Sequence, residues 1–229
     1  HPHCRRQRQM CIRDSPSSMQ KEAAEKTASA ISRIKGSEAE VVERSSGTRP
    51  RWTISVKCNP ENWRGLAEKL HSTHQVDYCS MITGIHWPEG PSEKKWEVVY
   101  HFLRTGVKNP PEIDGVQQPI ITDPTSVKGK MVPLEIEVSI AIPDTRTPSV
   151  PSIQDLWVGA DWNEKETWDL VGIDFEGHEG MRRVLQPHET PTGYHPLQKH
   201  HNLRYHGFEE MYDDAQGFSR KPDDVGKVK

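Results

Sequence analysis

The sequence predicts an α+β fold in which helices pack on a mixed β-sheet in two layers. Helix-forming residues, or apolar residues at helical spacing, occupy residues 20–35 and 60–71. Runs rich in β-branched and aromatic residues occupy three other ranges, 76–87, 95–103 and 131–142. Of the 229 residues, 33% are hydrophobic and 28% are charged, which fits one domain with a modest core and polar extensions.

The N-terminal end differs in composition from the rest of the chain. Residues 1–18 hold four arginines against one acidic residue and show no periodicity, so we interpret them as a leader or artefact outside the native fold. A targeting peptide is the alternative. We expect the domain over residues 19–199, beginning with an Ala-rich helix that Gly36 ends.

The middle of the chain alternates between strand and helix signals. Residues 40–43 and 52–57 predict a β-hairpin, because their β-branched residues flank a turn sequence. Asn59 is suited to cap the second helix and Pro60 to occupy its first position. In the last predicted strand, residues 131–142, apolar and polar residues alternate, as in a strand with one solvated face.

Proline-rich and aliphatic-poor segments mark the irregular parts of the chain. Residues 104–130 contain four prolines and scattered glycines, which predicts an inserted loop. Further prolines precede a short helix that we expect over residues 152–157. Residues 200–229 have few aliphatic residues and no sustained period, so we expect an extended or disordered tail that docks on a partner.

One stretch of the C-terminal half is especially rich in acids, tryptophans and glycines. Asp161 and Glu164 have the spacing of a capping box, which predicts a helix from Trp162 to Val171. Gly172 then offers the left-handed conformation that ends a helix.

Two acids of this predicted helix should face a pair of arginines. Helical spacing places Glu166 and Asp169 on one face, beside Trp162. A short glycine-bounded turn should then fold Arg182 and Arg183 back towards them. We expect these groups to pair in a buried or interfacial network. General acid–base catalysis by the carboxylates is the alternative, and no nucleophile motif accompanies them.

Motifs for cofactors and metals are missing from the sequence. It contains no GxGxxG, GxxxxGK[ST], GxSxG or HExxH pattern. The four cysteines lack CxxC spacing, so we expect reduced thiols and not iron–sulfur ligands. The histidines at 178, 188, 195, 200, 201 and 206 do not have the spacing of a zinc site, so we expect solvated or packing side chains. We therefore expect no catalytic, cofactor-binding or metal-binding residues in this chain.

Composition also bears on the partners of the chain. No apolar run approaches the ~18 residues of a membrane-spanning helix, so any membrane association should go through a partner. The net charge is −3 and is more negative without the basic leader, which disfavours binding to nucleic acid.

A set of residues in the C-terminal half follows a known pattern: Trp162, Glu164, Glu166, Asp169, Gly172, Gly177, His178, Arg182, Arg183, His195, Pro196 and Lys199. In this order they resemble the signature of the thirty-kilodalton subunit family of respiratory complex I, also known as the C-type subunit. That signature is roughly E-R-E-x-x-D, two apolar residues, G-I-x-F-x-G-H-P-x, an apolar residue and R-R, followed later by H-P-L-R-K. The resemblance covers residues 151–199, and Lys165, Glu179 and Gln198 depart from the pattern.

The resemblance implies a non-catalytic structural subunit in the peripheral arm of a proton-translocating NADH:quinone oxidoreductase. It implies docking on the D-type, quinone-site subunit, near the B-type subunit with the terminal iron–sulfur cluster. FMN, iron–sulfur clusters and quinone then belong to partner subunits. The resemblance also implies that the complex lies on the cytoplasmic face of the cell membrane, with this chain as a peripheral component.

Two alternatives stay open at this point. The same type of subunit serves F420H2- or ferredoxin-driven dehydrogenases and energy-converting hydrogenases, and the sequence does not separate these donors. A stand-alone metalloenzyme built on the histidines is the remote alternative.

Overall fold

The computed structural model describes residues 16–46, 49–106, 112–113, 116–117 and 132–200. The chain divides into two units, residues 1–198 and 199–229, and every helix and strand below lies in the first. The described residues form an α+β fold in which helices accompany a five-stranded mixed sheet, so the predicted fold class is confirmed.

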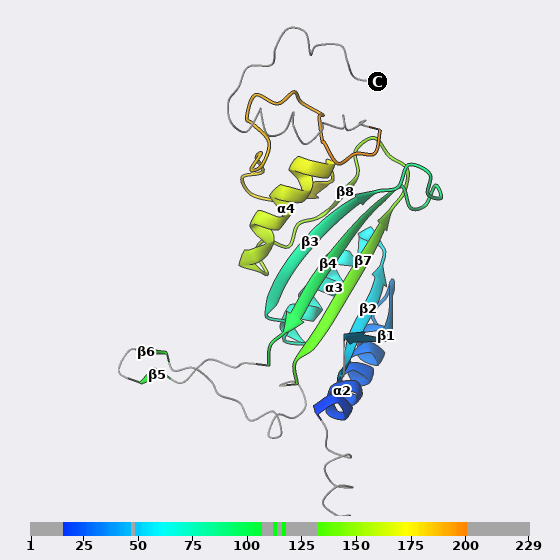
Figure 1. The fold of residues 1–229 in the computed structure, drawn as a ribbon, viewed down its shortest axis with the longest axis vertical. Coiled ribbons are helices and arrows are strands. Elements are labelled where there is room, and N and C mark those ends of the chain that lie inside the picture. Colours follow the sequence, from blue (N-terminus) through cyan, green and yellow to red (C-terminus); the bar gives the residue numbers. More distant parts are fainter. Residues whose placement is uncertain (1–15, 47–48, 107–111, 114–115, 118–131, 201–229) are drawn as a thin grey trace, which may run out of the picture. The chain divides into compact units, whose positions relative to one another are not determined.

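The central sheet has the strand order β1-β2-β7-β4-β3 (Figure 1). Its strands are β1 (Ser37–Ser46), β2 (Arg49–Cys58), β3 (Tyr78–His86), β4 (Trp96–Arg104) and β7 (Leu134–Ile142). β2 and β7 run parallel, and the other neighbours run antiparallel. The predicted hairpin and the three predicted strands are therefore present, with their ends shifted by a few residues.

Two short strand pairs lie outside this sheet. β5 (Glu112–Ile113) pairs antiparallel with β6 (Val116–Gln117), within the segment predicted as an inserted loop. β8 (Ser149–Pro151) pairs in parallel with β9 (Asp174–Glu176), so the chain before α4 lies next to the chain after it.

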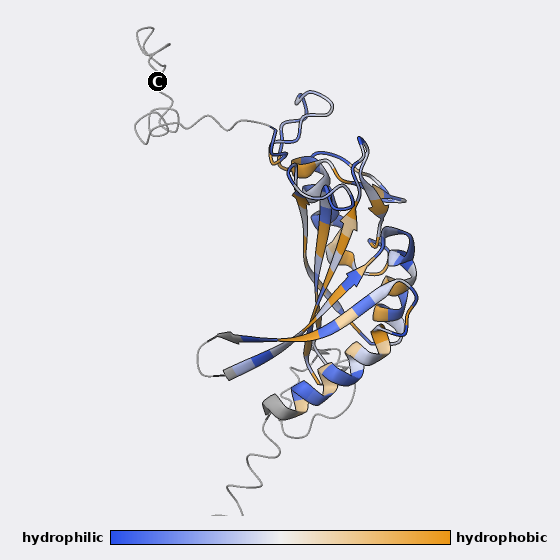
Figure 2. Cartoon of the chain, turned by 90° about the vertical axis from the view of Figure 1, so that its right-hand side faces the viewer, coloured by the Kyte–Doolittle hydropathy of each residue, from blue (hydrophilic) through white to orange (hydrophobic). Residues whose placement is uncertain are grey.

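Helices cover one face of the central sheet. α2 (Pro16–Ile31) packs on β1 and β2, α3 (Pro60–Ser72) on β7, and α4 (Val158–Val171) on β3. Figure 2 shows α2 and α3 on the same side of the sheet. The ring of Trp63 in α3 lies 4.3 Å from that of Tyr100 and 6.2 Å from that of Phe102, both in β4. Alternate residues of β7 are buried, which confirms the one-sided strand predicted there.

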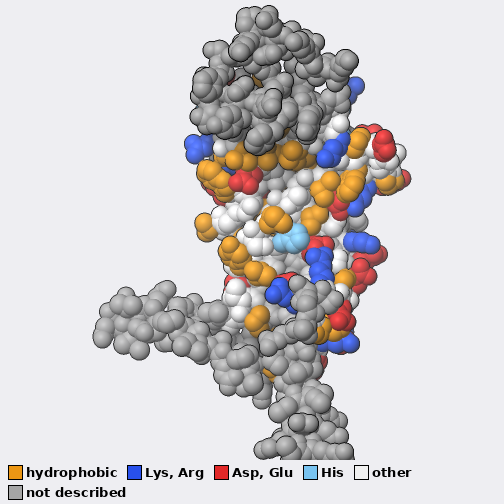
Figure 3. Space-filling model, in the orientation of Figure 1, with side chains coloured by type: hydrophobic (Ala, Val, Ile, Leu, Met, Phe, Trp, Pro, Cys, Tyr) orange, Lys and Arg blue, Asp and Glu red, His pale blue; other side chains and the backbone are white. Residues whose placement is uncertain are grey.

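The other face of the sheet carries a mixed surface. Arg44 of β1 forms an ion pair with Glu137 of β7 at 2.7 Å. Glu97 of β4 accepts hydrogen bonds from the Trp87 indole and the Ser139 hydroxyl. Figure 3 shows charged and hydrophobic side chains interspersed on the face of the molecule that is viewed in Figure 1.

The first helix ends earlier than predicted. It stops at Ile31, five residues before Gly36, because the hydroxyl of Ser37 donates to the carbonyls of Ile31 and Ile34 and thereby satisfies part of the helix end. Gly36 instead has a φ of +77° in the turn that leads into β1. Asn59 occupies the N-cap position of α3 as predicted, but its side chain makes no capping hydrogen bond.

The start of α4 also differs from the prediction. α4 begins at Val158, four residues before the expected position, and its N-cap is Trp157. The capping box of Asp161 and Glu164 is therefore wrong, because both residues lie inside the helix. The short helix predicted over residues 152–157 is wrong as well, since the chain makes a turn there.

Several predictions fall partly or wholly outside the described residues. Residues 1–15 of the predicted leader lie outside, whereas residues 16–18 belong to α2. Most of the 104–130 loop and all of the 200–229 tail after His200 also lie outside. Among the residues that are described, no helix is long and apolar enough to cross a membrane.

Candidate functional site

The signature region consists of β8, α4, β9 and the loop that follows β9. Gly84 in β3 lets α4 approach the sheet closely, because a Cβ at this position would lie 2.7 Å from Cγ2 of Thr167. The hydroxyl of Thr167 donates a 3.1 Å hydrogen bond to the carbonyl of Ile82. α4 is thus fixed to the edge strand by direct contact with its backbone.

Trp157 anchors the first turn of α4. Its side chain is buried, and its indole N–H donates to the carbonyl of Val76 at 3.0 Å. Its ring lies 4.7 Å from that of Phe102 in the core. These long-range contacts, and no capping side chain, set the residue at which the helix begins.

Glu164 is a buried carboxylate in the middle of α4. Its side chain has no exposed surface and accepts hydrogen bonds from the Ser152 hydroxyl at 2.6 Å and the Ile153 amide at 2.8 Å. Burial raises its pKa to about 7, even though these two donors favour the charged form. Glu164 therefore ties α4 to the segment after β8, in place of the reciprocal cap that the sequence predicted.

Asp161 and His178 form a second contact near the start of α4. The Nε2 atom of His178 lies 3.3 Å from Oδ1 of Asp161 and 3.8 Å from Oε2 of Glu164. Lys165 pairs with Asp161 at 2.8 Å, so the lysine that replaces the arginine of the family pattern still forms an ion pair. The His178 side chain is fully buried, which holds the turn after β9 against the helix.

Asp169 is the most heavily bonded carboxylate of the region. Its Oδ2 accepts hydrogen bonds from three successive amides, those of Val184, Leu185 and Gln186, at 2.8 to 3.0 Å. Its Oδ1 forms a 2.7 Å ion pair with Arg183. Burial by itself would raise the pKa of Asp169, but these four donors hold it below its usual value.

Arg183 extends this contact to the loop beyond it. Its guanidinium donates to the carbonyls of Pro191 at 3.0 Å and Tyr194 at 3.2 Å. It also lies over the ring of Trp168, 5.6 Å from the ring centroid. Arg183 thus connects Asp169 of α4 to the loop that contains Pro191 and Tyr194.

The segment after Tyr194 closes the C-terminus of α4. Gly172 has a φ of +84°, as predicted. The last carbonyls of the helix accept hydrogen bonds from this segment: Leu170 from the Leu197 amide and Val171 from the Gln198 side chain. A ring nitrogen of His195, Nδ1, lies 3.0 Å from the carbonyl oxygen of Asp169. Gln198, which replaces an arginine of the family pattern, therefore serves as a helix cap.

Other signature residues stay apart from this network. Within the described chain, Glu166 and Arg182 form no ion pair, so the predicted pairing of two acids with two arginines is wrong for these two. Side chains of adjacent residues in an extended segment point in opposite directions, so Arg183 faces α4 while Arg182 is exposed. Trp162 is 51% exposed, whereas the side chain of Asp169 is fully buried.

The remaining signature residues have simpler places. Gly177 has a φ of +80°, as the turn after β9 requires. Pro196 lies in the segment that closes α4, and Lys199 is the first residue of the second unit.

Sequence reasoning missed a contact between α3 and the chain before α4. Arg64 of α3 forms two 2.6 Å hydrogen bonds with the carboxylate of Asp155 and donates to the Ser152 carbonyl at 2.9 Å. The P-S-x-x-D spacing offered a signal, because it places Ser152 and Asp155 on one turn. The guanidinium of Arg64 holds the pKa of Asp155 below its ordinary value.

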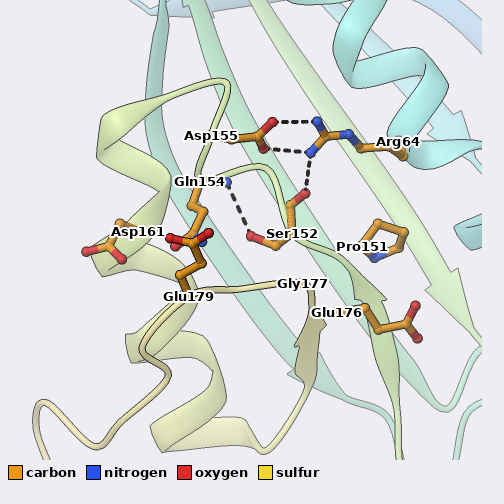
Figure 4. Close-up of a pocket in the computed structure, with 9 residues that line it drawn as sticks. All are labelled: Arg64, Pro151, Ser152, Gln154, Asp155, Asp161, Glu176, Gly177 and Glu179. Carbon is orange, nitrogen blue, oxygen red and sulfur yellow. Dashed lines mark hydrogen bonds and ion pairs between the residues drawn. The ribbon is translucent and has the colours of Figure 1, made fainter.

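An open cleft of about 840 Å³ lies beside this contact. Figure 4 shows the side chains that line it, which include the carboxylates Asp155, Asp161, Glu176 and Glu179. In the described part of the chain, no group of three or more His, Cys, Asp or Glu side chains could hold a metal ion. His201 and His206 of the predicted histidine group lie outside that part.

The region just described recurs in known proteins. Residues 56–207 match the family described as "Respiratory-chain NADH dehydrogenase, 30 Kd subunit". The chain belongs to this family. The match begins near the end of β2 and includes β3, β4, β7 and the network around α4.

Individual relatives agree with the family assignment. The chain is 30% identical to the C-type subunit of NADH-quinone oxidoreductase from Agrobacterium fabrum, over 71% of this chain and 66% of that protein. It is 45% identical to the subunit of the same name from Chloroherpeton thalassium, over 67% of this chain and 53% of that protein. The chain thus spans slightly less than two thirds of one relative and about half of the other.

A solved structure has a related fold. A chain of the membrane-bound sulfane sulfur reductase, an archaeal respiratory membrane complex, superposes with a TM-score of 0.52 at 17% identity. The superposition covers 87% of this chain and 96% of that chain. At this identity the comparison bears on the fold alone.

Proposed function

We propose that this chain is a non-catalytic structural subunit of a proton-translocating NADH:quinone oxidoreductase. In this proposal it docks on the quinone-site subunit, close to the subunit that holds the terminal iron–sulfur cluster. The observation that carries the proposal is the family match over residues 56–207, together with relatives named as C-type subunits of NADH-quinone oxidoreductase.

The contacts that the signature side chains make within the chain support a structural role. Glu164, Asp169, Arg183 and His195 all direct their polar atoms to partners within the chain. Asp169 alone binds three backbone amides and a guanidinium, which leaves its carboxylate little capacity for proton transfer. Internal contacts of this kind fix the shape of the surface around them. A structural subunit needs a surface of fixed shape to hold its partner subunits in place.

The proposal assigns the redox groups to other chains. FMN, iron–sulfur clusters and quinone would be bound by partner subunits, and this chain would fix the placement of those subunits. It would lie on the cytoplasmic face of the cell membrane and reach the membrane only through the complex.

The experiment is affinity purification of the full chain from membranes of its own host, with an assay of quinone reduction. We expect NADH-driven quinone reduction to co-purify with the chain, and the chain expressed alone to show neither this activity nor visible flavin or iron–sulfur absorbance. A chromophore bound by the isolated chain would contradict the non-catalytic role. A complex that accepts reduced ferredoxin or reduced deazaflavin in place of NADH would assign the chain to one of those enzymes.

A further inference from the structure

Two apolar side chains project from the N-terminal half of α4 into solvent. Val158 is 93% exposed and Trp162 is 51% exposed. Residues four apart in a helix lie on the same face, so the two side chains form one surface. Within the described residues the Trp162 ring takes part in none of the aromatic pairs and its indole makes no hydrogen bond, although Trp157 and Trp168 of the same region do make such contacts. An exposed tryptophan leaves a large apolar area in water, and this area is available for burial against a partner.

This apolar face adjoins the acidic cleft. Asp161 precedes Trp162 in the helix and lines the cleft, together with Glu176 of β9 and Glu179 of the following turn (Figure 4). Glu179 is exposed and forms no ion pair with any described residue. Arg64 is the basic residue of the cleft lining, and it is already bonded to Asp155 and Glu68. Lys165 likewise pairs with Asp161, whereas Glu176 and Glu179 form no ion pair with a described residue, so the cleft keeps negative charge that the described chain does not neutralise.

We propose that the Val158–Trp162 face of α4 and the adjoining acidic cleft form one docking surface for a partner subunit. The fitting partner segment presents an apolar side chain to Trp162 and lysines or arginines to the carboxylates of the cleft. This inference rests on the proposed function, because it names the part of the chain that would join the complex.

Charge complementarity identifies this occupant. Interfaces commonly place an aromatic anchor at the centre and charged groups at the rim, and opposite charges across the interface fix the register. A second copy of this chain would bring the same carboxylates against each other in a symmetric contact. Nucleic acid and anionic lipid headgroups carry negative charge, so this cleft would repel them.

The test uses variants of the full chain expressed in its own host. The disruptive variants are Trp162→Glu, which places a charge at the apolar face, and Glu179→Lys, which reverses a charge of the cleft. The matched controls are Trp162→Phe, which keeps an aromatic ring, and Glu40→Lys, which reverses an exposed carboxylate of β1 that forms no ion pair with described residues. The readouts are the fraction of the chain retained in the membrane complex and the melting temperature of the isolated chain.

We expect Trp162→Glu to lower retention at least about tenfold, as loss of an aromatic anchor does. Glu179→Lys should lower it about threefold or more, with a larger effect at low salt, because a rim charge acts through screened electrostatics. The retention of the two controls should stay within about twofold of that of the wild type. The melting temperatures of Glu179→Lys and Glu40→Lys should match that of the wild type, since these side chains are exposed. Trp162 is half-buried, so its variants should have somewhat lower melting temperatures but remain folded at the temperature of the retention assay. Retention of both disruptive variants at the wild-type level would overturn the docking surface and leave the proposed function intact.

A photo-crosslinking amino acid at position 162 of the assembled complex provides the second measurement. A cross-linked peptide from another subunit that carries lysine or arginine supports the proposal. A cross-link to a second copy of the chain, a cross-link to lipid, or no cross-link at all overturns it. If the wild-type chain joins no complex, the proposed function fails and this inference fails with it.

Discussion

Glu164 and Asp169 lie on the same helix and are both fully buried, yet their pKa values shift in opposite directions. Glu164 accepts two hydrogen bonds from neutral groups, and burial raises its pKa to about 7. Asp169 accepts three from backbone amides and one from a guanidinium, and its pKa falls. Burial alone therefore does not determine the charge of a carboxylate, because the number and charge of its donors decide the outcome.

The two halves of α4 consequently contribute differently to stability. The half around Asp169 depends on an ionised carboxylate that accepts hydrogen bonds from residues 183–186. Arg183 extends this contact by donating hydrogen bonds to the carbonyls of residues 191 and 194. The half around Glu164 has a carboxylate that is about half protonated at pH 7, because its pKa is about 7, and it holds the segment at 152–153. The following predictions test this contrast, from the largest expected effect to the smallest.

The largest effect should follow from breaking the buried ion pair. Arg183→Ala or Asp169→Ala should lower the free energy of unfolding by about 3–5 kcal/mol, because each leaves an uncompensated buried charge or unsatisfied amides. We also expect the complex to fail to assemble with either variant. Urea unfolding of the isolated chain measures the first effect and native gel electrophoresis the second.

The catalytic alternative makes the opposite forecast for Asp169. An Asp169→Asn variant that assembles fully and unfolds normally, but whose complex loses turnover, would reassign this carboxylate to proton transfer. A loss of stability with normal turnover in the remaining complex agrees with the structural role.

The next effect concerns pH. The folded state holds the Glu164 proton up to a pKa of about 7, compared with an ordinary value of 4.5, so it binds more protons than the unfolded state in this window. Stability should therefore fall as pH rises from 4.5 to 7, by at most about 3 kcal/mol from this group. Glu164→Gln should flatten the curve and make the variant the more stable protein at about pH 8.

Urea unfolding between about pH 5 and pH 8 measures this slope. Asp169 provides the contrast, because its lowered pKa makes its contribution disappear as pH falls below its ordinary value of 3.8. Equal slopes for wild type and Glu164→Gln would show that Glu164 is ionised in both states.

A smaller effect should arise at the closed C-terminus of α4. Gly172→Ala should cost more than the about 1–2 kcal/mol of a left-handed alanine, because the new Cβ would lie 2.6 Å from a ring carbon of His195. Gly177→Ala is the matched control, since Gly177 has a φ of +80° and open space around it. Equal costs for the two variants would mean that residues 195–198 do not cover the helix end.

The smallest effect should come from the signature residues outside the network. Arg182→Ala and Glu166→Ala should each change the free energy of unfolding by less than about 0.5 kcal/mol, because neither residue is fully buried and neither forms an ion pair with described residues. Calorimetry of the isolated chain measures this. A cost near that of Arg183→Ala would mean that all four charged residues act as one network.

Local patterns predicted much of the fold correctly. Alternation over residues 131–142 indicated β7, and apolar spacing from Trp63 to Leu70 indicated α3, because both periods depend only on backbone geometry. The Asp169–Arg183 contact also followed from helical spacing and a short turn. Helix ends were predicted less well, since tertiary partners can replace a local cap.

The sequence by itself determined the α+β class, the alternation of polar and apolar faces along the strands, and the stretch in which the charged residues gather. Only the tertiary structure decided where α4 begins and which way it is turned. Trp157 sets the start of the helix through Val76, a residue 81 positions away. The rotation that buries Glu164 and exposes Trp162 depends on contacts with β3 and residues 152–153. Such contacts join separate segments, and no local period of the sequence encodes them.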